Sequence, residues 1–263
     1  MKKNIKLFAF LIIILSQQRL MGQNTIGNFL NKDLKSIQNK LQPQQQVDNI
    51  TEYNKLKIKI KSDDFTTVKS EDIEIKIGSQ VYMGKNLDVS YYRNGDPIPQ
   101  VTDLDKWVTL TTGAWCYYKN ESSYGEVYGK LYNWYAVNDP RGIAPTGWHV
   151  PSNDEWGILD KYLGGGDKSG VKLKAHGSKD WEYINSDLIN QTGFAGMPSG
   201  SLTFFGMRGM FIDEGISAVW WSSTPINGAN DLAWVRFLYE GSDYFAQVGY
   251  GKNDGYSIRC IKD

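Results

Sequence analysis

Histidine and cysteine, the side chains that most often carry metal or nucleophilic chemistry, are scarce in this sequence. The 263 residues include two histidines, His149 and His176, and two cysteines, Cys116 and Cys260. Neither cysteine has a second one at metal-ligand spacing, so no zinc site is expected. There is no GxSxG nucleophile elbow, and two histidines leave little scope for a Ser/His/Asp triad. The sequence therefore predicts no catalytic residues, no metal site and no cofactor, and a protein that is not an enzyme.

An excess of charge of either sign is also absent. The chain has 29 basic and 29 acidic residues, which give a formal net charge of zero. No basic stripe or polybasic helix is present, so we expect no nucleic-acid partner and no attachment to a membrane surface through charge. Tyrosine (16), tryptophan (9) and glycine (27), in contrast, are plentiful. That composition favours a fold rich in sheet and loops with aromatic packing.

A hydrophobic run long enough to span a bilayer is missing too. The run LFAFLIIIL occupies residues 7–15 and follows the basic start MKKNIK, whereas a spanning helix needs about 20 apolar residues. A basic start, a short apolar core and a small residue before a cut predict a secretory signal peptide over residues 1–22, with Gln23 as the mature start. A buried N-terminal helix is the alternative. We expect an exported protein, in the periplasm, on the cell surface or outside, whose mature form is not inserted in a membrane.

Export leaves two alternatives for the cysteines. An exported chain with two cysteines can form one disulfide, here between Cys116 and Cys260. Both residues lie in strand-like stretches, AWCYYKN and YSIRCIKD. Two separate buried thiols are the other interpretation, and the sequence leaves both open.

Residues 23–70 read as a stalk or linker that contains a short amphipathic helix. The spacing of Leu30, Leu34, Ile37 and Leu41 places them on one helical stripe, which Pro43 ends. Such a stripe suits self-association through residues 28–41, or docking on the main domain. Residues 56–62 alternate apolar and basic side chains, which is typical of a strand or an extended linker.

The main domain is expected to span residues 71–263. The stretch DIEIKIGSQVYM alternates on both sides of Gly78-Ser79, which predicts a β-hairpin. The aromatic runs at residues 113–118, 128–137 and 231–240 are strand-like. No internal repeat of 20 to 50 residues is apparent.

The stretch GWHVPSNDEW resembles a chemical site but predicts the start of a helix. Ser152 lies three residues before Glu155, which is the capping-box pattern, and Asp154 suits the first helical turn. An apolar stripe follows, and Gly164 to Gly166 end the helix. The members of the stripe are Trp156, Leu159, Tyr162 and Leu163. His149, beside Trp148, is interpreted as a partly buried structural histidine.

Several segments taken together resemble the Fibrobacter succinogenes major paralogous domain. They are GSQVYMGKNLDV, YRNGDPIPQ, AWCYYKNESSYGEVYGKLYNWYAVNDPRGIAPTGWHVPSNDEW, GFAGMPSG, VWWSST and GYSIRCIKD. The resemblance covers residues 71–263 and implies an α+β, C-type-lectin-like domain. Such a domain has twisted antiparallel strands, one or two helices and long loops, and its last strand, here GYSIRC, pairs near the first one. The family is common in exported proteins of Bacteroidetes-like bacteria, and no general activity is established for it.

Two departures from related proteins bear on function. Calcium-dependent lectins of this fold use Glu-Pro-Asn or Gln-Pro-Asp with Trp-Asn-Asp, and neither set occurs here. A loop of Asn227, Asn230 and Asp231 supplies too few oxygens for a calcium ion, which takes six to eight. Formylglycine-generating enzymes need a C-terminal cysteine pair, and Cys260 stands alone.

The last part of the chain has the composition of a recognition surface. Tyrosine gives large contact area at small entropic cost, and small polar residues give adaptable hydrogen bonds. The candidate contacts are Phe237, Tyr239, Tyr244, Tyr250 and Lys252. Trp234, Arg236 and Arg259 are assigned to the frame, in buried pairs or stacks. The resemblance implies that retroelements diversify this segment in some family members. Ordinary strand and turn residues are the alternative.

The first functional hypothesis is an exported, non-catalytic recognition module whose C-terminal face binds a surface protein or a glycan. The second is a structural or assembly component of the cell envelope, with self-association through residues 28–41. An enzyme related to the formylglycine-generating enzymes is a distant third, since the required cysteine pair is missing.

Overall fold

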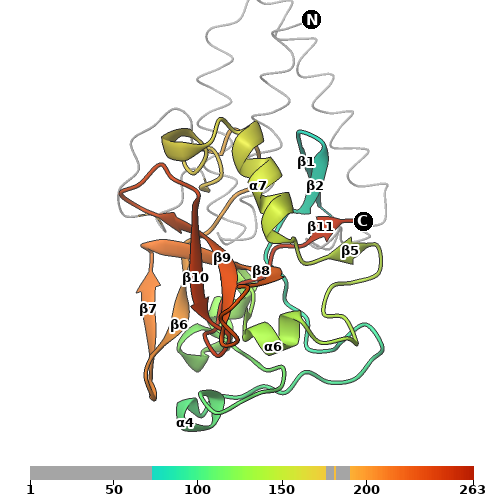
Figure 1. Cartoon of the computed structure of the whole chain (residues 1–263), viewed down its shortest axis with the longest axis vertical. Coiled ribbons are helices and arrows are strands. Elements are labelled where there is room, and N and C mark those ends of the chain that lie inside the picture. Colours follow the sequence, from blue (N-terminus) through green and yellow to red (C-terminus); the bar gives the residue numbers. More distant parts are fainter. Residues whose placement is uncertain (1–72, 176–180, 182–189) are drawn as a thin grey trace, which may run out of the picture. The chain divides into compact units, whose positions relative to one another are not determined.

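The computed structural model describes residues 73–175, 181 and 190–263, and Figure 1 shows their arrangement. All of them belong to one compact unit that runs from Val68 to Asp263. The signal peptide at residues 1–22, the stalk at 23–70 with its stripe at 28–41, and His176 lie outside the described residues. Within the described part, no helix is both long and apolar enough to cross a membrane.

The domain is mixed α+β, as the sequence predicts, and its strands pair antiparallel. The strands are β1 Glu74–Ile77, β2 Gln80–Met83, β3 Trp115–Cys116, β4 Leu131–Tyr132, β5 Trp148–His149, β6 Ser199–Phe205, β7 Arg208–Glu214, β8 Ser217–Pro225, β9 Leu232–Tyr239, β10 Ala246–Gly251 and β11 Ile261–Lys262. The helices are α4 Leu104–Trp107, α5 Ser122–Tyr128, α6 Trp134–Val137 and α7 Asn153–Tyr162, with 3₁₀ turns η3 Tyr118–Asn120 and η4 Gly166–Lys168. Four α-helices in the described residues exceed the one or two expected, but α4 and α6 are single turns of 4 residues each.

One sheet joins the beginning and the end of the domain. Its strand order is β1-β2-β11-β5, and β1 and β2 form the predicted hairpin around Gly78-Ser79. Ile261 of β11 pairs with Tyr82 on one side and with His149 on the other. The last strand therefore pairs with β2, the neighbour of β1, as expected of a strand that pairs near the first one. Strand β11 comprises residues 261–262, directly after GYSIRC. The expectation that GYSIRC itself forms the last strand was therefore wrong by a few residues.

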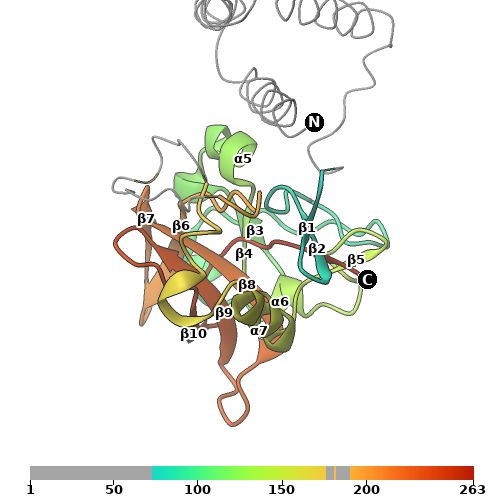
Figure 2. The ribbon, with the colours of Figure 1, turned by 90° about the horizontal axis from the view of Figure 1, so that it is seen from above.

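A second sheet, of order β10-β9-β8, separates two hydrophobic clusters. On one face, Trp156 of α7 donates its indole N–H to the Trp221 carbonyl at 3.3 Å. From the other cluster, Trp134 of α6 donates to the Ser222 carbonyl at 3.0 Å. Figure 2 shows α7 lying over β8 and β9. Buried side chains of β8 and β9 pack into both clusters, whereas no residue of β10 is fully buried. The strands β6 and β7 form a separate hairpin.

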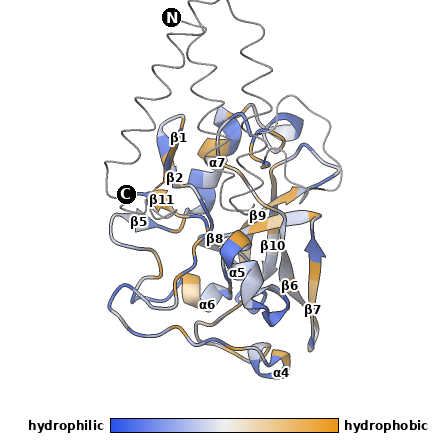
Figure 3. Ribbon diagram, turned by 180° about the vertical axis from the view of Figure 1, so that it is seen from behind, coloured by the Kyte–Doolittle hydropathy of each residue, from blue (hydrophilic) through white to orange (hydrophobic). Residues whose placement is uncertain are grey.

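Helix α7 begins and ends where the sequence predicts. Ser152 is the N-cap, and both hydrogen bonds of the capping box with Glu155 are present. Trp156 and Leu159 are fully buried, whereas Tyr162 is 63% exposed, so Tyr162 does not belong to the buried stripe. Both hydrophilic and hydrophobic segments are visible along this helix in Figure 3.

Residues 134–137 form the helical turn α6 instead of the expected strand, because the Asn133 side chain accepts the Ala136 N–H at 3.1 Å and starts a helix.

Cys116 and Cys260 are both free and buried, so the structure contains separate thiols and not the disulfide. Burial raises the pKa of both thiols, that of Cys260 to about 12.

Replacing Ser152 by alanine should lower the free energy of unfolding by about 1 kcal/mol, since the Glu155 N–H loses its side-chain acceptor at the start of α7. Urea unfolding of the two proteins measures the difference. Ser79→Ala, in the exposed β1–β2 turn, is the control and should change little. Equal stability of the Ser152 variant and the parent would contradict this account of the helix start.

Candidate functional site

The structure divides the five predicted contact residues into two groups at opposite ends of the β9–β10 pair. Phe237 lies opposite Ala246, where β10 begins, and Tyr250 lies opposite Ala233, near the start of β9. Tyr239 and Ala233 are six residues apart on the same face of β9, which corresponds to about 20 Å. The five residues therefore do not form one site.

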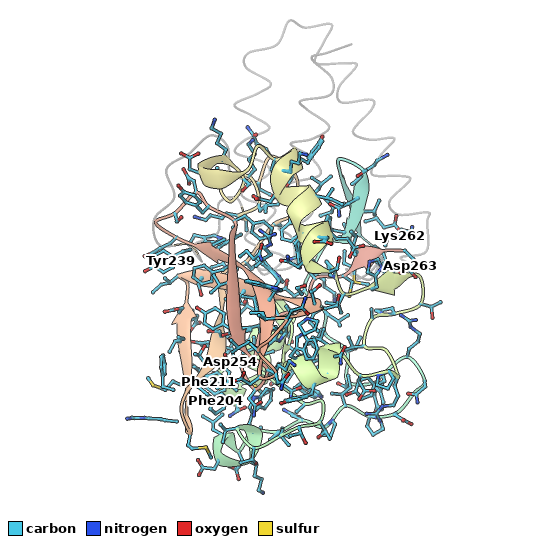
Figure 4. All side chains as sticks on the ribbon, in the orientation of Figure 1. Phe204, Phe211, Tyr239, Asp254, Lys262 and Asp263 are labelled. Atoms are coloured by element: carbon cyan, nitrogen blue, oxygen red, sulfur yellow. The ribbon has the colours of Figure 1, made fainter. Side chains whose placement is uncertain are left out.

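The first group is Phe237, Tyr239 and Tyr244, which we call the hairpin end. Phe237 and Tyr239 are two residues apart on β9, so they share a face of the strand. Their rings are stacked, with centroids 6.0 Å apart and planes at 20°. Tyr239 is 41% exposed and Tyr244, in the loop before β10, is 54% exposed. Figure 4 shows Tyr239 at the margin of the domain. Three aromatic rings are thus presented on or beside one short loop.

A buried lysine holds this loop in place. Lys174 is 1% exposed, and its Nζ donates to the carbonyls of Tyr239, Glu240 and Ser242 at 2.6, 2.9 and 2.8 Å. Burial lowers the pKa of Lys174 to about 8, although Asp243 and Glu240 offset part of that shift. Three acceptors satisfy all three ammonium donors. The loop backbone is therefore fixed before any ligand arrives.

A glycine allows the same loop to pack closely. The Gly170 N–H donates to the Asp243 carbonyl at 2.8 Å. A Cβ at Gly170 would lie 2.4 Å from the Tyr244 carbonyl oxygen, which no side chain tolerates. Residues 170–174 thus form a second support for the hairpin end.

The second group, Tyr250 and Lys252, is more deeply involved in packing. Tyr250 is half-buried, and its ring lies 5.4 Å from that of Tyr256. Lys252 donates to the Asn230 carbonyl at 2.6 Å and lies 4.5 Å from the centroid of the Trp134 ring. These contacts tie both side chains to the domain, so the second group is less suited to contact a ligand than the hairpin end.

A buried carboxyl group lies beside this second group. Asp254 is 4% exposed and accepts the backbone N–H of Phe204 at 2.9 Å and of Gly251 at 3.1 Å. The Tyr256 hydroxyl donates to it at 3.2 Å. Burial raises the pKa of Asp254 to about 6, against the opposing effect of these hydrogen bonds. Asp254 joins β10 to β6, near Phe204 in Figure 4, which is a structural task.

The residues assigned to the frame differ in burial. Arg236 is 5% and Arg259 is 1% exposed, and each guanidinium lies over a phenylalanine ring, at 5.5 Å from the centroid of Phe245 and 4.4 Å from that of Phe194. Trp234, in contrast, is half-buried. Trp148 is also half-buried and lies 5.8 Å from the Lys262 Nζ. No acidic group is hydrogen-bonded to either arginine in the described structure.

A family model described as Fibrobacter succinogenes major domain matches residues 75–262. The chain belongs to this family. Neither the comparison with curated proteins nor that with solved structures gave a match.

A Fibrobacter succinogenes major domain is thus the part of the chain that carries both groups of contact residues. The matched range begins four residues after the expected boundary at residue 71 and includes β1 to β11 apart from the first residue of β1. The family assignment supplies no ligand.

In this Fibrobacter succinogenes major domain, His149 is the centre of a polar cluster. Its Nδ1 lies 2.7 Å from Asp263 Oδ1, and its Nε2 lies 2.8 Å from Glu155 Oε1. Both ring nitrogens face carboxylates, which requires two N–H donors and therefore the charged imidazolium. Partial burial opposes the charge, but the two carboxylates outweigh it and raise the pKa of His149. Glu155 also accepts the Ser152 N–H at 2.7 Å. The Glu155 pKa is held below its ordinary value by these bonds despite burial.

This cluster joins the C-terminal strand to the start of α7 and leaves no free nucleophile. The Ser152 hydroxyl donates to Glu155 at 2.8 Å, so its proton is engaged by that carboxylate. Within residues 73–175, 181 and 190–263, no group of three or more His, Cys, Asp or Glu side chains is arranged to hold a metal ion. The arrangement is that of a clasp between β11 and α7.

The clasp makes stability depend on pH. Because the folded pKa of His149 is raised, its contribution is fully present below the ordinary value near 6.5 and is lost as the pH rises through the folded value. His149→Gln should therefore cost about 0.5–1 kcal/mol at pH 5.5, since the pair is partly exposed, and less at pH 9. Thermal unfolding at the two pH values measures this. Asp263→Asn removes one of the two carboxylates, so the pH at which the contribution of His149 to stability is lost should be lower. A cost that is equal at both pH values would exclude the charged clasp.

Sequence reasoning missed Lys174, Asp254 and Asn86, whose side-chain oxygen accepts hydrogen bonds from Trp220 and Arg259. In the run VKLKA, alternation places Lys174 on the same side as Lys172, towards solvent. Its acceptors lie 65 to 68 residues further along the chain, so no local pattern reveals them. Asp254 is similar, because Phe204 is 50 residues away.

Proposed function

We propose that this protein is an exported, non-catalytic recognition module. In this proposal the domain has a C-type-lectin-like fold, and the hairpin end binds a surface protein or a glycan. The observation that carries it is the exposed pair Tyr239 and Tyr244 on a loop whose backbone Lys174 holds by three hydrogen bonds. Exposed tyrosines on a rigid support bind at low entropic cost, because little remains to be ordered.

In the described part of the chain, two buried polar atoms next to the hairpin end have no hydrogen-bond partner. Ser217 lies opposite Tyr239 in the β8–β9 pairing. Among the described residues, its hydroxyl and the Oε2 of Glu240 are buried side-chain atoms without a hydrogen-bond partner. Such atoms are costly unless water or a ligand satisfies them.

The side chains of the described part that could carry chemistry have structural contacts. His149 is engaged on both sides by Asp263 and Glu155, and the two thiols are buried with raised pKa values. Export is proposed from the apolar run at residues 7–15.

A glycan array and a panel of purified envelope and host-surface proteins test the proposal, with and without calcium. For a ligand found in the screen, Tyr239→Ala and Tyr244→Ala should each weaken binding by about tenfold or more, the usual effect of losing a central aromatic contact. Tyr91→Ala is the matched control, because Tyr91 is 61% exposed and lies outside the hairpin end. Binding that survives both variants, or no binding in any condition, would exclude the hairpin end as the recognition site.

A further inference from the structure

A cavity of about 350 Å³ lies between the β1–β2 turn and the end of α7. It is at the lower end of the range of about 300–1,000 Å³ that small-molecule sites occupy. Its polar and aromatic lining comes from four separate segments and includes Lys76, Tyr162, Lys172, Gln191 and Thr192. None of the candidate contact residues of the hairpin end is among them.

Among the described residues, the lining carries positive charge and no acidic side chain. Lys76 and Lys172 are the charged residues among the described ones that line the cavity. Lys172 donates to the Leu163 carbonyl at 2.6 Å, so its ammonium is positioned at the end of α7 with donors to spare. Glu74, next but one to Lys76 on β1, is already paired with Lys262. The cavity therefore favours an anion.

Tyr162 supplies an aromatic wall. It is 63% exposed, although it follows the buried part of an amphipathic helix. Its ring packs on Gly78, where a Cβ would lie 2.9 Å from the ring. Gly78 has φ +62, a conformation that glycine adopts without strain. The turn thus supports one part of the ring and leaves the rest accessible.

The polar groups at the rim add hydrogen-bonding capacity. The Thr192 hydroxyl donates to the Lys172 carbonyl at 3.0 Å and accepts the Phe194 N–H at 3.2 Å, which holds this rim against Lys172. Gln191, in contrast, is exposed. Its amide is both donor and acceptor. The cavity therefore offers two ammonium groups, an accessible phenol ring and an amide. These groups suit a ligand that has a small ring, hydroxyl groups and a negative charge.

We propose that this cavity binds an anionic sugar residue, carboxylated or sulfated, as a site separate from the hairpin end. The tyrosine ring stacks on the apolar face of the sugar, as aromatic rings do in amphipathic contacts. The two ammonium groups pair with the anionic substituent. The volume limits the bound part to one or two sugar rings. The proposal does not depend on the function of the hairpin end, because the two sites share no residue.

Calorimetric titration of the full chain tests the proposal with four probes. They are a glucuronate disaccharide, a sulfated galactose disaccharide, a neutral lactose control and inorganic sulfate. Binding of either anionic disaccharide, with lactose at least about tenfold weaker, is expected, since a charge-assisted contact is worth about one factor of ten or more. The ratio of the two anionic probes identifies the anion.

Lys76→Gln and Tyr162→Ala should each reduce the affinity for the better disaccharide by about tenfold. Lys161→Gln removes an adjacent lysine that does not line the cavity and should leave the affinity nearly unchanged. Both Lys76 and Tyr162 are exposed, so the variants should fold. Tyr239→Ala should not affect this binding, which separates it from the hairpin end.

Three results would overturn the proposal. The first is no binding of either anionic disaccharide. The second is binding that Lys76→Gln and Tyr162→Ala leave unchanged. The third is inorganic sulfate binding as tightly as the disaccharides, which would show an anion site without sugar recognition.

Discussion

Arg259→Ala is expected to lower the free energy of unfolding by about 4 kcal/mol, in the range of broken buried polar networks. The guanidinium is 1% exposed and has hydrogen bonds to three groups. It donates to the Met83 carbonyl at 3.2 Å and the Phe194 carbonyl at 2.7 Å. It also donates twice to the side-chain oxygen of Asn86, at 3.1 and 3.0 Å.

The large effect follows from what the arginine leaves behind. Alanine would leave two buried carbonyls without donors and open a cavity beside the Phe194 ring. Burial lowers the pKa of Arg259 to about 9, so the group is charged at pH 7 and its hydrogen bonds are charge-assisted. Asn86 also accepts the Trp220 indole N–H at 2.8 Å. Loss of Arg259 should therefore also disturb the contact of Asn86 with β8 in the second sheet.

Urea unfolding measures the loss, and two other variants make the result decisive. Arg259→Lys keeps the charge but not the planar fork, so it should cost about 2 kcal/mol even if the alanine variant does not fold. Arg141→Ala removes an arginine that is paired with Asp139 and Asp96 near the surface. Exposed pairs contribute about 1 kcal/mol or less. Equal costs for Arg259→Ala and Arg141→Ala would contradict the buried network.

Lys174→Met is expected to cost about 3 kcal/mol and to loosen the hairpin end. Methionine has a similar volume but no donors, so the carbonyls of Glu240 and Ser242 lose the lysine donor, and that of Tyr239 retains the Ser242 N–H. Each buried acceptor left unsatisfied costs about 1 kcal/mol or more, and part is recovered because no charge is buried. The Ser242 amide, which donates to the Tyr239 carbonyl at 3.1 Å, should exchange its hydrogen faster.

Urea unfolding and amide hydrogen exchange measure the two effects. Lys168→Met, at an exposed position, is the control and should leave both unchanged. In the Lys174→Met variant the loop must be ordered on binding. The variant should therefore also bind more weakly any ligand that contacts Tyr244. A variant with unaltered stability and unaltered exchange at Ser242 would show that the lysine does not hold the loop.

The features predicted correctly from the sequence are those with local causes. The capping box of Ser152 and Glu155 spans four residues, and the helix α7 follows from it. The β1–β2 hairpin follows from alternation around Gly78-Ser79. Tyr162 was misassigned because periodicity places it on the buried stripe, whereas the helix end lies beside the β1–β2 turn and leaves the ring 63% exposed. Periodicity shows which face of a helix is apolar, but it does not show how far along the helix other parts of the domain cover that face.

The sequence by itself determined the family, the α+β class, the limits of α7 and the set of aromatic residues near the C-terminus. Only the tertiary structure decided how those residues are grouped, because β-strand pairing places Tyr239 and Tyr250 at opposite ends of one strand pair. It also decided that Cys116 and Cys260 remain separate thiols. The supports of the hairpin end and the buried arginine network are tertiary for the same reason. Lys174 and Arg259 bond to groups 65 or more residues away, and partners at that separation are chosen by packing, not by local pattern.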